Sequence, residues 1–265
     1  DDWPRKYPGG DYWYHYTFND NNISNTIDML RLAEEIYGDK KYRTAMLKAG
    51  DFILAAQMPE PQPAWAQQYN FQMEPVWARK FEPPAVSGGE SQRLIETLMD
   101  LYIDTGDRKF LEPIPRALAY LKRSQLRDGR LARFYELKTN RPLYLTTEYA
   151  LTYEDNDLPT HYGFQLGSRV DNLQQRYNTV IKRSEAEISK LRQTVTRPPT
   201  VSSLEPRVKE ILSAQDERGA WIETGRLKYH GKKDATTQVI SSDTFVRNLD
   251  TLSTYLSVVG AKPSR

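Results

Sequence analysis

The sequence predicts an all-α protein, an α/α toroid or partial barrel of repeated antiparallel helix pairs with a few short β-strands. Two observations favour this fold class. Apolar residues recur at helical spacing through most of the chain. In addition, two helix pairs read as copies of one unit. Repeated pairs of this kind bury their apolar faces by curling around a common axis. The alternative is an irregular helical domain without such repeats.

The predicted helices follow the periodicity of Leu, Ile, Ala and aromatic residues along the chain. A Gly-Asp turn, at Gly38 and again at Gly106, separates the two members of each of the first two pairs. Two prolines, Pro113 and Pro115, fall early enough to belong to a first helical turn. The predicted helices span residues 23–37, 45–56, 94–102, 110–121, 169–194, 204–214 and 245–256.

Each of the first two helix pairs is followed by a short extended tail. The tails read PAWAQQY at 63–69 and GRLARFY at 129–135, and a fainter third copy ends in DERGAWIE at 216–223. In a toroid these tails lie at one mouth, where loops converge on a cleft. The tails therefore mark the region in which a binding site is expected.

The bulk composition narrows the class of function. The chain has 265 residues without a sharp change in composition, which predicts one domain over residues 1–265. A net charge of +2 gives no electrostatic footprint for nucleic acid, so we expect no nucleic-acid partner. The absence of cysteine excludes disulfides, thiol nucleophiles and thiolate metal sites. Seventeen tyrosines and five tryptophans suit a carbohydrate-binding cleft as well as a core.

Nothing in the sequence is apolar for long enough to cross a membrane. The opening stretch DDWPRKYPGG is unlike a basic and then apolar signal peptide, although a signal could have been removed before it. Three histidines without paired spacing make a zinc site improbable.

A run of short polar side chains, HYTFNDNN at 15–22, precedes the first predicted helix. One helix cap needs one Asp or Asn, whereas Asn19, Asp20, Asn21 and Asn22 stand together. The excess predicts either a solvated turn or an oxygen-rich corner that holds a cation or a sugar, since calcium takes carboxylate and amide oxygens.

The loop ARKFEPPAVSGGES at 78–91 leads into the third predicted helix. As an ordinary connection it would place Ser87 or Ser91 as the helix cap and Glu90 near the helix start. Its excess of charged residues also suits a binding site. The segment ARFYELKTNRPLYL at 132–145 alternates as a short strand and turn, in which Arg133 and Arg141 could pair with carboxylates.

Five motifs in order resemble the polysaccharide lyase family 10 pectate lyases: WPRKYP near the start, FNDN at 18–21, WAQ at 65–67, the loop at 78–91, and ARFYELKTNRP at 132–142. The resemblance spans roughly residues 1–165. It implies an α/α toroid that cleaves polygalacturonate by anti-β-elimination with calcium and an arginine base. It also implies that Asp20 is a calcium ligand.

Three departures from the family pattern stand beside this resemblance. Where the family has a second calcium aspartate in an AQHD-like stretch, this chain reads AQQYN, which offers Tyr69 or, with a one-residue slip, Asn70. The segment expected to carry the base arginine is shortened to RDGR, with Arg127 or Arg130 as substitutes. Where the family has an Arg-rich motif before a late Gly-Tyr, this chain reads PTHYGF at 159–164, with His161.

The resulting hypothesis is a calcium-assisted pectate lyase that acts on an acidic polysaccharide or oligosaccharide as a monomer, in a secreted or periplasmic location. The alternatives are a degenerate lyase-like protein that only binds carbohydrate, and a toroid glycoside hydrolase using Glu82 and Glu90. The candidate catalytic residues are Arg130, Arg133 and Arg141. The candidate substrate-binding residues are Asn19, Gln67, Arg79, Lys80, Glu90 and His161. The candidate metal ligands are Asp20 and Asn70.

Overall fold

The computed structural model describes residues 3–193, 199–227 and 235–260. Their contacts group into two compact units, Asp1–Arg192 and Gln193–Arg265. The sequence predicted one domain over residues 1–265. Composition gives no signal for the division, because the second unit repeats the helix, turn and tail pattern of the first.

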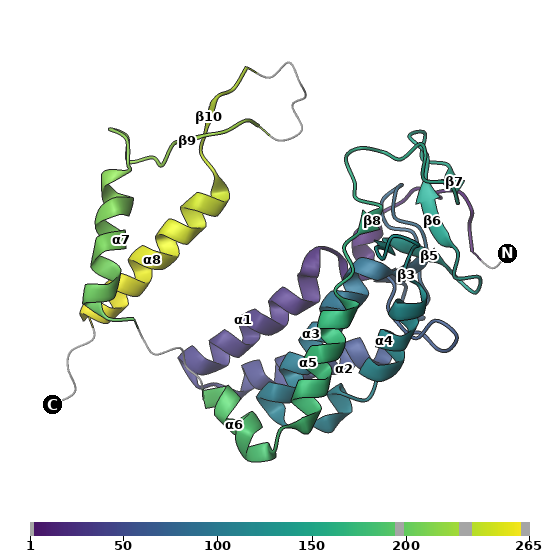
Figure 1. Ribbon diagram of the computed structural model, residues 1–265, viewed down its shortest axis with the longest axis horizontal. Helices are drawn as coiled ribbons and strands as arrows, with labels where there is room; N and C mark the ends of the chain where they lie inside the picture. Colours follow the sequence, from purple (N-terminus) through teal and green to yellow (C-terminus); the bar gives the residue numbers. More distant parts are fainter. Residues whose placement is uncertain (1–2, 194–198, 228–234, 261–265) are drawn as a thin grey trace. The chain divides into compact units, whose positions relative to one another are not determined.

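The first unit begins with two antiparallel helix pairs (Figure 1). Helix α1 (Asn22–Tyr37) packs on α2 (Lys40–Ala55), and α3 (Gly88–Thr105) packs on η3 (Arg108–Phe110) and α4 (Ile114–Arg123). The predicted Gly-Asp turns are confirmed. Gly38 and Gly106 end α1 and α3 in the left-handed region, at φ of 65° and 74°. The aspartate that follows each glycine caps the next helix through its side chain.

Helix α3 is the central element of this unit. It contacts α1, α2, α4 and α5 (Val170–Lys182), and its apolar residues are buried along most of its length. The buried apolar residues of α3 are Leu94, Ile95, Leu98, Met99, Leu101 and Tyr102. Because its sides are covered by other helices, the N-terminus of α3 is held firmly where the tails converge.

The long polar helix predicted over residues 169–194 is divided in the structure. Helix α5 ends at Lys182, Arg183 is extended, and α6 (Glu185–Gln193) begins anew. The cause is a reciprocal cap at Ser184, whose backbone and side chain donate to the Glu187 carboxylate while the Glu187 amide donates back to the Ser184 hydroxyl. Residue 194, the predicted end, lies outside the described residues.

The strands are short and all pair antiparallel. Strands β3, β5, β6 and β7 form one sheet in that order, β1 pairs with β2, and β4 pairs with β8. The strand and turn predicted at 132–145 are confirmed as the β5–β6 hairpin. The bounds in this unit are β1 Tyr16–Thr17, β2 Gln68–Tyr69, β3 Ala85–Ser87, β4 Leu131–Ala132, β5 Phe134–Glu136, β6 Pro142–Leu145, β7 Leu151–Thr152 and β8 Gln165–Leu166.

The two tails of the first unit repeat one contact. The Tyr69 hydroxyl accepts a hydrogen bond from the Ala66 amide at 2.6 Å, and the Tyr135 hydroxyl accepts one from the Ala132 amide at 2.9 Å. Both tyrosines are buried. Each tail is therefore folded back on itself in the same way, which supports the repeat inferred from sequence.

The second unit contains α7 (Val201–Ser213), β9 (Glu223–Thr224), β10 (Gln238–Val239) and α8 (Ser242–Gly260), with α7 packed on α8. The indole of Trp221 donates to the Ile211 carbonyl at 2.8 Å, as the indole of Trp65 donates to the Ile53 carbonyl at the same distance. This shared contact shows the third copy of the tail. The mainly helical fold class is confirmed, with no closed barrel among the described residues. None of the described helices is long and apolar enough to cross a membrane.

Candidate functional site

The segment before α1, the first turns of α3, the second tail and the segment before α5 surround a cavity of about 540 Å³, here called the Asp20 cavity. Arginine and acidic side chains dominate its lining. The lining residues are Asn19, Asp20, Asn21, Gly89, Glu90, Arg93, Glu96, Arg133, Tyr162, Leu166 and Arg169. The structure thus brings together four residues predicted from sequence, namely Asn19, Asp20, Glu90 and Arg133.

Glu90 is placed in the cavity by the cap of α3. Of the two serines that the sequence offered as the cap, Ser87 is the N-cap; its hydroxyl accepts from the Glu90 amide and donates to the Glu90 carboxylate. Gly88 lets the start of α3 lie close to the second tail, because a Cβ at that position would lie 2.3 Å from the Ala132 carbonyl oxygen. One helix cap therefore joins the first helical turn of α3 to the second tail.

A network of buried polar side chains lies beneath the cavity. The Gln67 amide group donates to the Asn19 side-chain oxygen at 2.9 Å, to Glu90 at 3.2 Å and to the Tyr162 hydroxyl at 3.1 Å. Asn19 and Tyr162 in turn each donate to Glu82 at 3.1 Å. Gln67 does not line the cavity, yet it connects three of the residues that do. Networks of this kind hold side chains in one arrangement because every exchange would leave a buried group unpaired.

Arg79 completes this network from one side. Its guanidinium donates to both oxygens of Glu82, with an Nε to Oε2 distance of 2.8 Å. These hydrogen bonds, opposed by burial and aided by the charges of Glu82 and Asp20, raise the pKa of Arg79 above its usual value. Arg79 and Asp20 therefore lie near enough to interact. Arg79 is held protonated, which suits a positioning role and not that of a base.

Asp20 stands at the rim with an unusual backbone. Both Asp20 and Asn21 adopt the left-handed region, at φ of 54° and 57°, which is uncommon for residues other than glycine. Asn21 precedes α1 but makes no side-chain capping bond. The Asp20 carboxylate makes no hydrogen bond or ion pair with another described residue. The polar side chain of Asn21 therefore makes no hydrogen bond that caps α1, and the Asp20 carboxylate can bind a ligand.

The donor set suits a cation only in part. Calcium takes six to eight oxygen ligands. Asn19 is already engaged by Gln67, by Glu82 and by the Asp20 amide, which leaves the Asp20 carboxylate and the Asn21 amide on this corner. No group of three or more His, Cys, Asp or Glu side chains able to hold a metal occurs in residues 3–193, 199–227 and 235–260. The corner therefore offers one charged ligand.

Arg133 is the predicted catalytic arginine that reaches the cavity. Its guanidinium lies 4.4 Å from the centre of the Tyr162 ring, its Nε donates to the Gly163 carbonyl, and its Nη1 is 3.7 Å from a Glu90 oxygen. With 18% of its side chain exposed, Arg133 is fixed in orientation but still open to the cavity.

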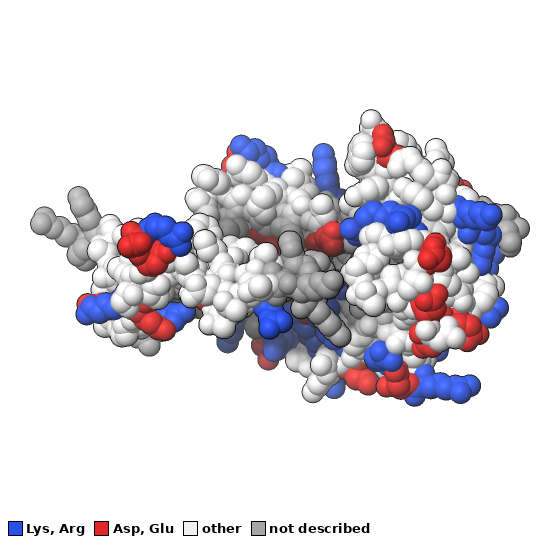
Figure 2. Space-filling view, turned by 90° about the horizontal axis from the view of Figure 1, so that it is seen from above, with Lys and Arg blue, Asp and Glu red and all other residues white. Residues whose placement is uncertain are grey.

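Two further arginines face the same space. Arg93 and Arg169 both donate to Glu96, at 3.2 Å and 3.1 Å. Burial alone would raise the pKa of Glu96, but the hydrogen bonds from Arg169 and Arg93 outweigh burial, so that its pKa is lowered. Figure 2 shows acidic and basic side chains in small mixed groups over the visible face, with no continuous patch of either sign. Three arginines, Arg93, Arg133 and Arg169, line the Asp20 cavity.

Several predicted residues are not brought to the cavity. Arg141 lies 3.4 Å from the centre of the Tyr153 ring, and Lys80 lies 3.8 Å from the centre of the Tyr149 ring. Arg130 is exposed and bonds Asp128 across its own turn at 2.7 Å. His161 packs edge-on against Phe81, next to the cavity but not in its lining.

The two residues considered for a second metal ligand also lie elsewhere. The side-chain oxygen of Asn70 accepts from the amides of Gln72 and Glu74, at 3.0 Å and 2.9 Å, and so closes a turn. Tyr69 is a buried residue of the tail, where burial raises the pKa of its hydroxyl. Neither residue lines the Asp20 cavity.

Sequence reasoning missed Tyr162, Arg93 and Arg169 as site residues. Arg93 follows Glu90 by three positions on a helix, so that both face one side, and this signal was available. Tyr162 adjoins His161, which had been selected from the same motif. Arg169 carried no signal, because only the fold brings the start of α5 to α3.

The proposed glycoside hydrolase pair is not supported by this geometry. Glu90 lines the cavity, but Glu82 is 1% exposed and lies under it, with its oxygens occupied by Arg79, Asn19 and Tyr162. Two carboxylates flanking one bond with room for a water are required for hydrolysis.

The family model for pectic acid lyase matches residues 1–132. Those residues belong to the pectic acid lyase family. One solved structure supports the fold. A mutant of a family 10 polysaccharide lyase from Cellvibrio cellulosa, in complex with trigalacturonic acid, matches with a TM-score of 0.56 and 21% identity over 66% of each chain. A second structure of the Cellvibrio cellulosa enzyme matches with a TM-score of 0.49 and 21% identity, over 66% of this chain and 65% of that one.

No curated protein sequence matches this chain. The chain spans about two thirds of the length of the solved Cellvibrio structures. The pectic acid lyase match includes Asp20, Gln67, Arg79 and Glu90 and ends one residue before Arg133. The Asp20 cavity is therefore built partly from the matched region and partly from residues that follow it.

Proposed function

We propose that this protein is a pectate lyase-type polysaccharide lyase, secreted or periplasmic, that cleaves polygalacturonate by β-elimination in the Asp20 cavity. The observation that carries this proposal is the convergence of one unpaired carboxylate, Asp20, with three arginines in a single open cavity. Guanidinium groups bind carboxylates through paired hydrogen bonds, which suits a chain of uronate residues. A neutral polysaccharide would offer the three guanidinium groups no carboxylate of its own.

The proposed reaction removes the proton on C5 of a galacturonate. The electrons of the C5–H bond form a double bond between C4 and C5, the bond from C4 to the glycosidic oxygen breaks, and that oxygen takes a proton from water. The hydroxide formed in this way takes the proton back from the base, so that no water is consumed. Arg133 is the proposed base that accepts the C5 proton. Arg93 and Arg169 hold uronate carboxylates and place the C5–H bond against Arg133.

Arg133 lies among groups of both charges. Arg93 and Arg169 line the same cavity, and an oxygen of Glu90 lies 3.7 Å from Arg133. An arginine acts as a base only in its neutral form, which nearby positive charge favours in general.

Asp20, with Asn21 beside it, would hold calcium in this reaction. Bound there, the ion would neutralise the negative charge that develops on the substrate carboxylate during proton removal. One charged protein ligand is few for calcium, so the ion is expected to bind tightly only when uronate oxygens complete its shell. Both residues line the cavity and have a left-handed backbone, which sets the direction of their side chains.

A second function, carbohydrate binding without cleavage, is favoured by one observation. The Arg133 guanidinium is engaged by Glu90, by the Gly163 carbonyl and by the Tyr162 ring, and contacts of this kind fix an arginine as a binding group. In this case the cavity would bind trigalacturonate or longer chains through its arginines and release them unchanged.

The test is incubation of the full chain with polygalacturonate and calcium, followed by the ultraviolet absorbance of the unsaturated product. The proposal requires this absorbance to rise with the wild type and to stay flat with Arg133→Ala and Asp20→Asn. Arg130→Ala is the matched control, since Arg130 lies outside the cavity, and should keep the wild-type rate. Calorimetric binding of trigalacturonate without any product would establish the second function. Reducing ends without unsaturated product would indicate hydrolysis and contradict both.

A further inference from the structure

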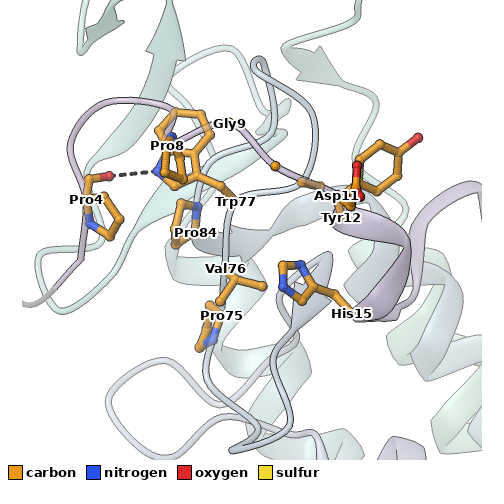
Figure 3. Close-up of a pocket in the computed structure, with 12 residues that line it drawn as sticks. Pro4, Pro8, Gly9, Asp11, Tyr12, His15, Pro75, Val76, Trp77 and Pro84 are labelled. Atoms are coloured by element: carbon orange, nitrogen blue, oxygen red, sulfur yellow. Dashed lines mark hydrogen bonds between the residues drawn. The ribbon is translucent and has the colours of Figure 1, made fainter.

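A second, smaller pocket of about 260 Å³ lies in the first unit between the N-terminal segment 4–15 and the segment 75–84, and is here called the His15 pocket (Figure 3). Its walls include Asp11, Tyr12 and His15 from the first segment, and Trp77 and Pro84 from the second. None of its lining residues lines the Asp20 cavity. It is therefore a separate candidate site.

His15 presents an unpaired polar atom in this pocket. Its Nδ1 is buried and has no hydrogen-bond partner among the described residues. Leaving a buried polar atom unpaired costs about 1–3 kcal/mol, so such an atom in a folded protein is normally expected to bind a water molecule, an ion or a ligand. Figure 3 shows the imidazole directed toward Val76 and the interior of the pocket. A ligand hydroxyl could satisfy Nδ1 in either tautomer, because a hydroxyl both donates and accepts.

The opposite wall is rigid and apolar. The Trp77 indole is held by a hydrogen bond from its Nε1 to the Pro4 carbonyl at 2.7 Å and packs edge-on against Tyr7. The rings of Pro8 and Pro84 lie beside it in Figure 3. Flat apolar rings on one side and hydrogen-bonding groups on the other match the two faces of a sugar ring.

The negative charge of Asp11 favours a neutral sugar over a uronate in this pocket. Asp11 is an exposed carboxylate and the lining contains no lysine or arginine. A uronate would bring a second negative charge to Asp11, whereas a neutral sugar would donate hydroxyl protons to it. The volume of about 260 Å³ lies below the range of pockets for drug-sized ligands, about 300–1,000 Å³, and therefore suits a single sugar residue.

Two exposed aromatic residues directly follow the pocket's lining residue Tyr12 in the sequence. Trp13 and Tyr14, which follow the lining residue Tyr12 in the short helix η1 (Tyr12–Tyr14), are 67% and 66% exposed. The rings of Tyr12 and Trp13 are 5.9 Å apart. Neighbouring residues of a glycan bound in the pocket could rest on these rings, which otherwise remain in water.

We propose that the His15 pocket binds a neutral pyranose residue of a glycan, with its hydroxyls bonded to His15 and Asp11 and its apolar face on Trp77 and the adjoining prolines. This site anchors a neutral portion of a polysaccharide, and it takes no part in bond cleavage. The proposal does not depend on lyase activity in the Asp20 cavity.

The test uses two sugars that differ in one group, D-galactose and D-galacturonate, titrated into isotope-labelled full chain and followed by NMR. Galactose should shift the Trp77 indole signal, and galacturonate should not. His15→Ala should weaken galactose binding about tenfold, as expected for one lost hydrogen bond to a buried group. Tyr37→Ala, which removes an exposed ring on α1 remote from the pocket lining, is the matched control and should bind as the wild type does.

Asp11→Asn provides a second variant that leaves His15 in place. It should allow galacturonate to shift the Trp77 signal, because the repelling charge is gone. Absence of a Trp77 shift with galactose, equal shifts with both sugars in the wild type, or unchanged galactose affinity in His15→Ala would each overturn the proposal. Asp20→Asn separates the two sites, since it should stop cleavage of polygalacturonate and leave galactose binding intact.

Discussion

Replacing Glu82 by leucine tests whether the buried network holds the first unit together. Glu82 is 1% exposed and accepts hydrogen bonds from Arg79, Asn19 and Tyr162. The leucine removes all these acceptors and leaves a guanidinium facing an apolar side chain. Removing one partner of a buried ion pair costs about 3–5 kcal/mol, and each orphaned polar group adds about 1–3 kcal/mol. About one third of the Arg79 side chain is exposed and can be rehydrated, so a loss of about 3–5 kcal/mol is expected in total.

The double variant Glu82→Leu with Arg79→Leu gives the sharper measurement. If the loss arises from an unpaired arginine, removing Arg79 as well should restore part of the stability, and the two single losses should not add. Urea denaturation followed by tryptophan fluorescence measures the free energy of unfolding of each variant. A loss below about 1 kcal/mol in Glu82→Leu, or strict additivity in the double variant, would refute the role assigned to this network.

Three further outcomes follow from individual contacts. The lowered pKa of Glu96 means that folding favours its ionised form. This contribution to stability is fully present above the unfolded-state pKa of about 4.3 and is lost as the pH falls through the folded-state pKa. Glu96→Gln should remove that part of the pH dependence when unfolding is measured in acid titrations. Ser184→Ala should cost about 1 kcal/mol and lower the helical signal in circular dichroism, because it removes the cap that begins α6, whereas Ser213→Ala, at the end of α7, should change neither appreciably. Asn70→Asp should leave calcium affinity measured with oligogalacturonate unchanged, since Asn70 closes a turn outside the Asp20 cavity. Tighter calcium binding by this variant would show that residue 70 is a calcium ligand.

Local chemistry was predictable because it depends on neighbours in sequence. The Gly-Asp turns at 38 and 106, the Ser87 cap and the β5–β6 hairpin are each made by residues a few positions apart, so their patterns are visible in the chain. The cap at Ser184 is equally local, but the sequence pattern on both sides of it led to the prediction of one continuous helix, whereas the structure has two. Motif order likewise pointed to the pectic acid lyase family over the first part of the chain.

By itself the sequence determined the helix pairs, their repeated tails and the placement of Asp20, Glu90 and Arg133 on elements that meet. Only the tertiary structure decided which arginines share the cavity. Arg133, Arg130 and Arg141 are close in sequence, yet the turn at Asp128 and the ring of Tyr153 hold the last two away from it. Arg93 and Arg169 are far apart in sequence and meet at Glu96 because α5 packs on α3. Contacts over such separations depend on how helices pack, which the local pattern of residues does not specify.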